Sequence, residues 1–123
     1  MKVKNRLFEI LARSQSLNVL ASARELEPEM KFHVFELKEK IIEAEKPFFA
    51  TRNDIIKSYA VDNEIPEDKQ NKVNAEFEKV LEMEVELDHK ILVIPKIPKD
   101  ISANDMFNLR ELVKFQNSKK KKK

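Results

Sequence analysis

Glycine and cysteine are both absent from this chain of 123 residues. Without glycine, the sequence lacks the residue that tight turns of positive φ and close backbone approach to a phosphate require. This argues against a Walker loop, a dinucleotide-binding fingerprint and a nucleophile elbow. Without cysteine, there is no disulfide framework, thiolate zinc site or cysteine nucleophile. We therefore expect a protein that is not an enzyme and that uses no cofactor and no small-molecule substrate.

A run of about 20 apolar residues, the length that spans a bilayer, is also missing. The first six residues lead into a charged amphipathic pattern and not into a signal peptide. The lack of cysteine is compatible with a reducing cytoplasm. The sequence thus predicts a protein that is neither secreted nor embedded in a membrane.

The composition favours one small, mostly α domain. Charged residues make up 37% of the chain and hydrophobic residues 41%, and eight phenylalanines give it a core to bury. We expect a single helical domain over residues 1–117 and a disordered lysine tail over 118–123. The helices are expected at about residues 3–24, 29–60, 66–83 and 103–115.

The longest of these helices carries a regular apolar pattern, and the domain is expected to form around it. Doublets recur every seven residues: Val34-Phe35, Ile41-Ile42, Phe48-Phe49 and Ile55-Ile56. On a helical wheel the first members form one seam and the second members form another, about 100° further round. A column of four residues runs between the two seams: Lys38, Glu45, Arg52 and Tyr59. This pattern predicts a helix held between two neighbours.

Pro47 falls inside this helix, on the polar side of the wheel. An interior proline kinks a helix, whereas a proline at the first position opens one. The seven-residue register continues across Pro47, and Lys46 is a poor N-cap. We therefore favour one kinked helix over two helices.

Three other segments complete the expected fold. Residues 3–24 form one helix or two short ones, because polar residues separate two apolar clusters. Residues 84–97 change to a period of two and predict extended structure, either a small hairpin or an arm over the helices. Ser102 with Asp105 predicts a capping box at the start of the last helix. Its expected apolar face consists of Met106, Leu109, Leu112 and Val113.

Residues able to carry chemistry are scattered. His33 and His89 lie far apart and have no metal-binding spacing, so we interpret both as solvated side chains and expect no metal site. Glu84, Glu86 and Asp88 lie close in sequence, but nothing marks them as buried or perturbed. No residue is assigned a catalytic role.

The long helix supplies the expected protein interface, through apolar side chains that exceed what a small domain buries. Its residues are Phe35, Ile42, Phe48, Phe49, Arg52 and Ile56. Lys38, Glu45 and Arg52 either set pairing and register or lay their stems along the groove with their charged ends in water, and we favour the second interpretation. The expected partner is another protein or a further copy of the chain.

The lysine run suggests an alternative function. Its members are Lys119, Lys120, Lys121, Lys122 and Lys123. Without them the net charge of +2 becomes −3, from 19 basic and 22 acidic residues in 1–118. The run is suited to nucleic-acid phosphates, but it is equally suited to a solubilising or artificial tail, and the acidic remainder has no basic and aromatic stacking platform.

Residues 17–115 resemble a family of short, uncharacterised proteins of tailed bacteriophages. The likeness is carried by LNVLASARELEPEMKFHVFELKEKI, KPFFATRNDIIKSY, NAEFEKVLEMEVELD and ISANDMFNLRELV, in that order. Such proteins are often encoded among structural and morphogenesis genes. The resemblance implies a virion structural or assembly component, located in the host cytoplasm or the virion, and it carries no functional residues. A phage inhibitor that docks on a host protein through the acidic body is a further alternative.

Overall fold

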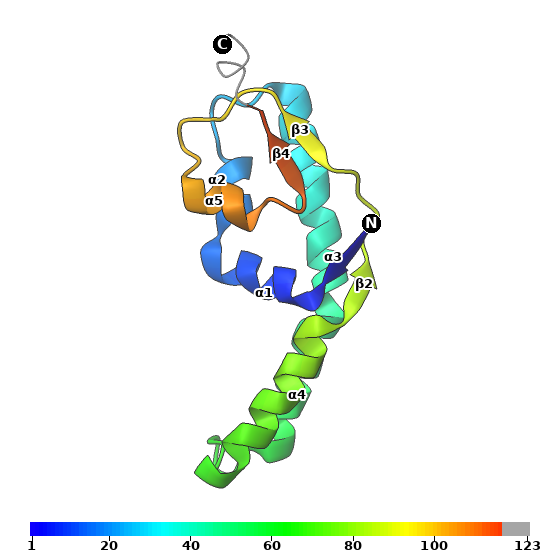
Figure 1. Cartoon of the computed structure of the whole chain (residues 1–123), viewed down its shortest axis with the longest axis vertical. Helices are drawn as coiled ribbons and strands as arrows, with labels where there is room; N and C mark the ends of the chain where they lie inside the picture. The colour runs from blue at the N-terminus through cyan, green and yellow to red at the C-terminus, as the bar shows by residue number, and fades with distance from the viewer. Residues whose placement is uncertain (117–123) are drawn as a thin grey trace.

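The computed structural model describes residues 1–116, and their fold is mostly α, as the sequence predicts. The elements in chain order are β1 (Lys2–Lys4), α1 (Asn5–Ser14), α2 (Ser16–Ala21), α3 (Pro28–Tyr59), the 3₁₀ turn η1 (Glu67–Lys69), α4 (Gln70–Glu82), β2 (Glu84–Glu86), β3 (Leu92–Ile94), α5 (Ala103–Asn108) and β4 (Val113–Phe115). The expected tail, 118–123, lies outside the described residues. Figure 1 shows α3 running along most of the length of the molecule.

Helix α3 is one element of 32 residues, which corresponds to a length of about 48 Å. Pro28 opens it at the first turn, where the missing N–H of proline costs nothing. Pro47 lies inside the helix with its ring exposed to solvent, and the helix continues through it. The prediction of one long helix is therefore confirmed, and its bounds differ from the predicted 29–60 by one residue at each end.

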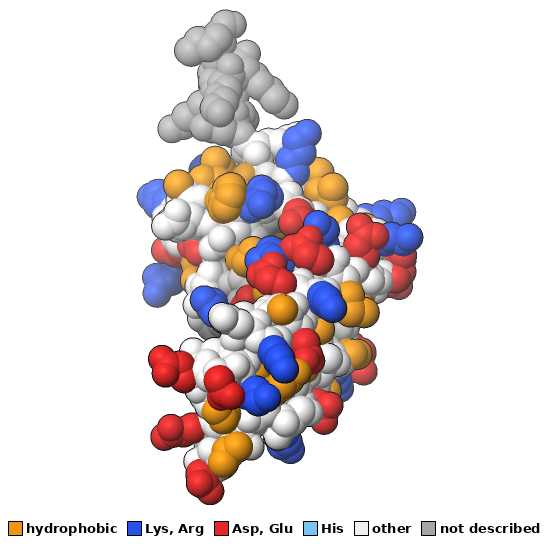
Figure 2. Space-filling view, turned by 60° about the horizontal axis from the view of Figure 1, so that its bottom comes forward, with side chains coloured by type: hydrophobic (Ala, Val, Ile, Leu, Met, Phe, Trp, Pro, Cys, Tyr) orange, Lys and Arg blue, Asp and Glu red, His pale blue; other side chains and the backbone are white. Residues whose placement is uncertain are grey.

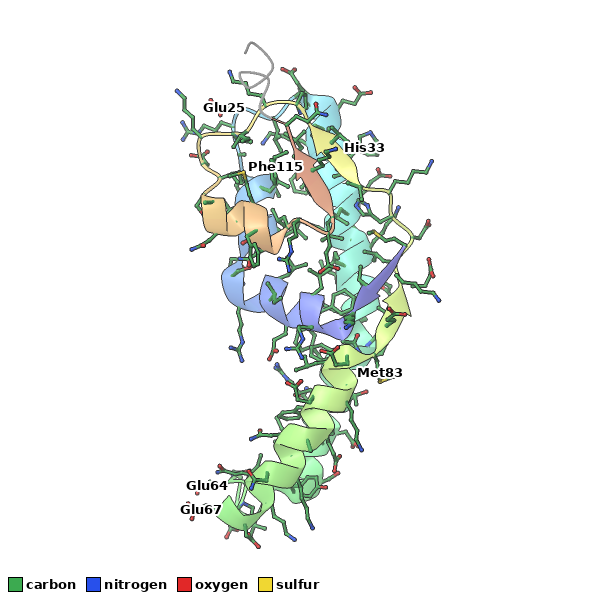
Figure 3. The ribbon with its side chains drawn as sticks, in the orientation of Figure 1. Glu25, His33, Glu64, Glu67, Met83 and Phe115 are labelled. Carbon is green, nitrogen blue, oxygen red and sulfur yellow. The ribbon has the colours of Figure 1, made fainter. Side chains whose placement is uncertain are left out.

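Helix α4 runs back along the C-terminal half of α3, so the two form a helical hairpin that extends from the rest of the molecule (Figure 1). Asp62 and Asn63 make the turn with φ of 53° and 68°, in the left-handed region that these two residue types tolerate. Glu64 and Glu67 lie at the free end of this hairpin, and Met83 lies where it meets the remaining elements (Figure 3). The predicted helix over 66–83 is divided into η1 and α4.

The helical segment predicted at about residues 3–24 begins later and ends earlier in the structure, at Asn5 and Ala21. Residues 2–4 form a strand, and the helical segment that follows is divided at Gln15, which has φ 59° and ψ 17°. Gln15 thus ends α1 in a left-handed conformation and turns the chain into α2. Of the two alternatives for this segment, two short helices are correct.

The predicted extended segment is confirmed near 84–97, but its two strands pair with distant segments and not with each other. Strand β2 lies antiparallel to β1, with Val85 opposite Val3. Strand β3 lies parallel to β4, with Leu92 opposite Val113. The segment is therefore neither an isolated hairpin nor a free arm.

The last predicted helix, 103–115, is correct at its start and wrong at its end. Ser102 and Asp105 form the expected capping box, with each side chain bonded to the other residue's backbone N–H. Helix α5 ends at Asn108, and after a turn the chain continues as β4. Leu109, Leu112 and Val113 are buried as expected of an apolar face, but the last of them is buried as part of a strand.

The core lies where α1, α2, α5 and the two strand pairs surround the N-terminal half of α3. Phe8 and Leu20 are fully buried there, together with Leu109 and Leu112 from the turn after α5. The hairpin formed by α3 and α4 is narrower: Ile55 and Val73 are buried within it, whereas Leu81 belongs to the main core cluster. The long helix therefore has a well-covered half and a sparsely covered half.

Candidate protein-interaction surface

The two seams predicted on α3 have different environments. The first seam faces the core: Val34, Ile41, Phe48 and Ile55 are buried, with Leu37 beside them. The second seam, which we define as Phe35, Ile42, Phe49 and Ile56, lies at the edge of the covered face. Phe35 is 49% exposed, Ile42 47% and Ile56 36%, while Phe49 is half-buried against the core. Neighbouring helices thus cover the first seam and leave most of the second accessible.

Phe48 is a correction to the predicted interface. Only 3% of its surface is accessible, because it belongs to the first seam and packs into the core cluster. Its ring lies against Phe49, with centroids 4.9 Å apart. Phe48 is therefore a structural residue, and of the predicted apolar interface residues Phe35, Ile42 and Ile56 remain exposed.

The column between the seams is half-buried along its length. The ammonium group of Lys38 lies 5.8 Å from the ring centroid of Phe35, and the guanidinium of Arg52 lies 4.9 Å from that of Phe49. Partial burial raises the pKa of Glu45 above its ordinary value. The stems of Lys38 and Arg52 thus lie beside phenylalanine rings of the second seam, and the interpretation that their charged ends reach water stays a prediction.

A small groove adjoins the lower end of the second seam, between α1, α3 and α4. It encloses about 260 Å³ and is lined by Glu9, Arg13, Phe48, Arg52, Ile56, Phe77, Val80 and Leu81. Oε2 of Glu9 lies 3.3 Å from Nη2 of Arg13 and 3.9 Å from Nη1 of Arg52. The buried Nε of Arg52 has no hydrogen-bond partner among residues 1–116. The groove combines an apolar floor with two guanidinium groups that share one carboxylate.

Sequence reasoning did not find the contributions of α1 and α4 to this groove. Glu9 and Phe77 are 68 residues apart and come together only because α1 packs across the α3–α4 hairpin. Neither residue has a local signal that distinguishes it from other charged or apolar helix residues. The three lining residues that α3 contributes, Phe48, Arg52 and Ile56, are among the interface residues predicted from the sequence.

A second, more polar groove of about 690 Å³ lies between α3 and the segment that joins β2 to β3. His33 lies on α3 and its Nδ1 is 3.0 Å from Oε1 of Glu36 (Figure 3). His89 lies on the opposite wall, where Nε2 donates to the carbonyl of Leu112 over 3.1 Å. His89 is half-buried, so the interpretation of this residue as a solvated side chain is wrong, and its burial lowers its pKa.

Among residues 1–116, no group of three or more His, Asp or Glu side chains is placed to hold a metal ion. In the same segment, no helix has the length and apolar character needed to cross a membrane. On the face that Figure 2 displays, basic and acidic side chains are interspersed, with hydrophobic side chains between them. A face with such mixed charges does not produce the electric field of a single sign that attracts an oppositely charged ligand.

Comparisons of the chain with protein-family models, with curated proteins and with solved structures find no match.

Proposed function

We propose that this chain is a non-enzymatic protein-interaction component that binds a protein partner through the second seam of α3. The observation that supports the proposal is the exposure of three large apolar side chains that belong to one seven-residue repeat, Phe35, Ile42 and Ile56, with the half-buried Phe49 completing the repeat between the last two. A spacing of seven keeps the side chains on one narrow stripe of a helix, which is the arrangement by which one helix binds another. An isolated exposed apolar residue needs no explanation, but an aligned set on one element does.

The position of the seam also favours binding. The first seam already fixes α3 in the core, so the second seam is presented on a rigid element and not on a loop. The stems of Lys38 and Arg52 cover part of two phenylalanine rings, so the apolar stripe has a charged border. A hydrophobic centre with a polar rim is typical of specific interfaces.

A phage particle or its assembly pathway is the proposed setting. This part of the proposal is supported by the resemblance of residues 17–115 to short tailed-phage proteins. The lysine tail, with its alternative of nucleic-acid binding, lies outside the described residues.

The test compares binding by the wild-type chain with binding by variants that place a charge on the seam, Phe35→Asp and Ile42→Asp. The tagged chain is incubated with extract from phage-infected cells and with purified particles, and bound proteins are identified by mass spectrometry. We expect a defined partner that both seam variants lose. Met83→Asp is the matched control, because Met83 is 56% exposed but lies off the seam at the end of α4.

Circular dichroism must show that the variants retain their helix content, which we expect because both altered side chains are about half exposed. The proposal fails if the wild-type chain forms no complex and no oligomer. It also fails if the seam variants and Met83→Asp retain the same partners equally well.

A further inference from the structure

The charges that border the second seam are arranged about one residue, Ile42. Lys38 and Glu45 lie on the side toward the core, and Glu39 and Lys46 lie on the solvent side. At 3.6 residues per turn, each pair is displaced by roughly 40–60° from the line of the seam. Each border therefore carries one positive and one negative charge, on opposite sides of Ile42 along the helix.

We propose that the occupant of the second seam is a second copy of this chain, whose α3 packs antiparallel with Ile42 on the two-fold axis. This inference rests on the proposed function and names the partner at the same surface. When two helices pack antiparallel about a two-fold axis, each border of one helix faces the same border of the other. With Ile42 opposite Ile42 of the second copy, Phe35 faces Phe49 and Phe49 faces Phe35. The apolar seam is thus self-complementary over three layers.

The same register pairs opposite charges on both borders. Lys38 faces Glu45 of the second copy on the core side, and Glu39 faces Lys46 of the second copy on the solvent side. The two-fold axis repeats both contacts, which gives four ion pairs. Antiparallel packing also sets the positive end of each helix dipole near the negative end of the other. Both borders of the seam are thus complementary in charge to themselves. Binding to a different protein does not require such self-complementarity, so the charge pattern favours a second copy of the chain.

Ile56 lies outside the three layers. In this register it lies opposite residue 28 of the second copy, where α3 begins. Ile56 also lines the groove with Phe77, and it is the least exposed of the three exposed seam residues. The C-terminal part of α3 therefore lies opposite the start of the second copy's α3, with Ile56 at the edge of the contact.

Sedimentation equilibrium of the full chain tests self-association. We expect a concentration-dependent dimer, and we expect Ile42→Lys to weaken it at least tenfold, because the substitution places two ammonium groups together on the axis. Met83→Lys adds the same charge away from the seam and is expected to leave the dissociation constant unchanged. A wild-type chain that stays monomeric up to about millimolar concentration overturns the inference.

Charge reversal distinguishes a second copy from any other occupant. Glu39→Lys places a positive charge against Lys46 of the other copy at both symmetry-related contacts. The substitution is expected to weaken the dimer by roughly two- to tenfold. Adding Lys46→Glu in the same chain restores opposite charges and is expected to restore the affinity. Failure of the double variant to recover overturns the proposed register.

The absence of cysteine permits a direct test of direction. We expect Ile42→Cys to form an intermolecular disulfide, and we expect Phe35→Cys to cross-link with Phe49→Cys when the two variants are mixed. Cross-linking of Phe35→Cys with itself overturns the antiparallel arrangement. If the chain is monomeric but the seam variants lose a different protein partner, the second-copy inference fails while the proposed function stands.

Discussion

The hydroxyl of Ser16 donates a 2.7 Å hydrogen bond to Oδ1 of Asp105, a residue 89 positions later in the chain. Ser16 is fully buried at the start of α2, and its oxygen also accepts from Nδ2 of Asn108 over 3.1 Å. Asp105 uses its other carboxylate oxygen to complete the capping box of α5. One carboxylate thus caps the N-terminus of α5 and joins this helix to α2.

Removal of either side of this contact is expected to destabilise the fold. Ser16→Ala and Asp105→Ala should each lower the free energy of unfolding by about 1–2 kcal/mol, because a buried polar group loses its partner and a cap is lost. Urea denaturation of the two single variants and the double variant gives the interaction free energy between the side chains of Ser16 and Asp105. We expect the double variant to lose less than the sum of the two single variants, and strict additivity would contradict a direct contact.

The two seams of α3 should respond differently to truncation. Phe48→Ala removes a ring that is 3% exposed and should cost about 3–5 kcal/mol through loss of burial and a residual cavity. Phe35→Ala removes a ring that is 49% exposed and should change stability by roughly 1 kcal/mol or less in dilute solution. Denaturant midpoints under identical conditions test this difference. Equal losses would mean that Phe35 is part of the core.

Acidification through the titration range of His89 is expected to destabilise the protein. Burial lowers the pKa of His89 from 6.5, and the nearby charges of Lys40 and the terminal ammonium of Met1 act in the same direction, while the bond to Leu112 opposes them. Because the unfolded chain then binds a proton more readily than the folded one, stability falls as pH falls below about 6.5.

His89→Gln provides the control for this effect, since glutamine retains an N–H donor for Leu112 but does not titrate. Thermal melts at about pH 7.5 and about pH 5.5 should differ less in the variant than in the wild type. An identical pH dependence of the melting temperature in both proteins would show that His89 does not cause the loss of stability on acidification.

Replacement of Pro47 by alanine is expected to stabilise α3. Proline cannot donate to the carbonyl four residues earlier, and its ring crowds that carbonyl. The ring is exposed, so Pro47→Ala removes no core contact and should raise the free energy of unfolding by about 1–3 kcal/mol. Differential scanning calorimetry measures the change. A loss of stability would show that the packing of α3 requires the shape that Pro47 imposes.

The features that the sequence predicted correctly are those with local causes. The seven-residue repeat on α3 and the capping box at Ser102 depend on neighbours within a few residues, and both are present. Leu109, Leu112 and Val113 have helical spacing, but the helix predicted to end at residue 115 failed because residues 113–115 pair instead with the distant strand β3. The doublets could not reveal which seam is covered, since α1 and α4 decide that in three dimensions.

The strand pairs have a consequence for synthesis of the chain. Strand β1 finds its partner only when residues 84–86 have been made, and β3 finds its partner only at residues 113–115. A nascent chain can therefore form α3 and its hairpin with α4 early, while Ile94, Leu109 and Leu112 stay without their final neighbours until the last described strand leaves the ribosome. A ribosome that stalls before residue 112 would display a formed hairpin attached to an open core, and such a chain is a natural substrate for chaperones and proteases.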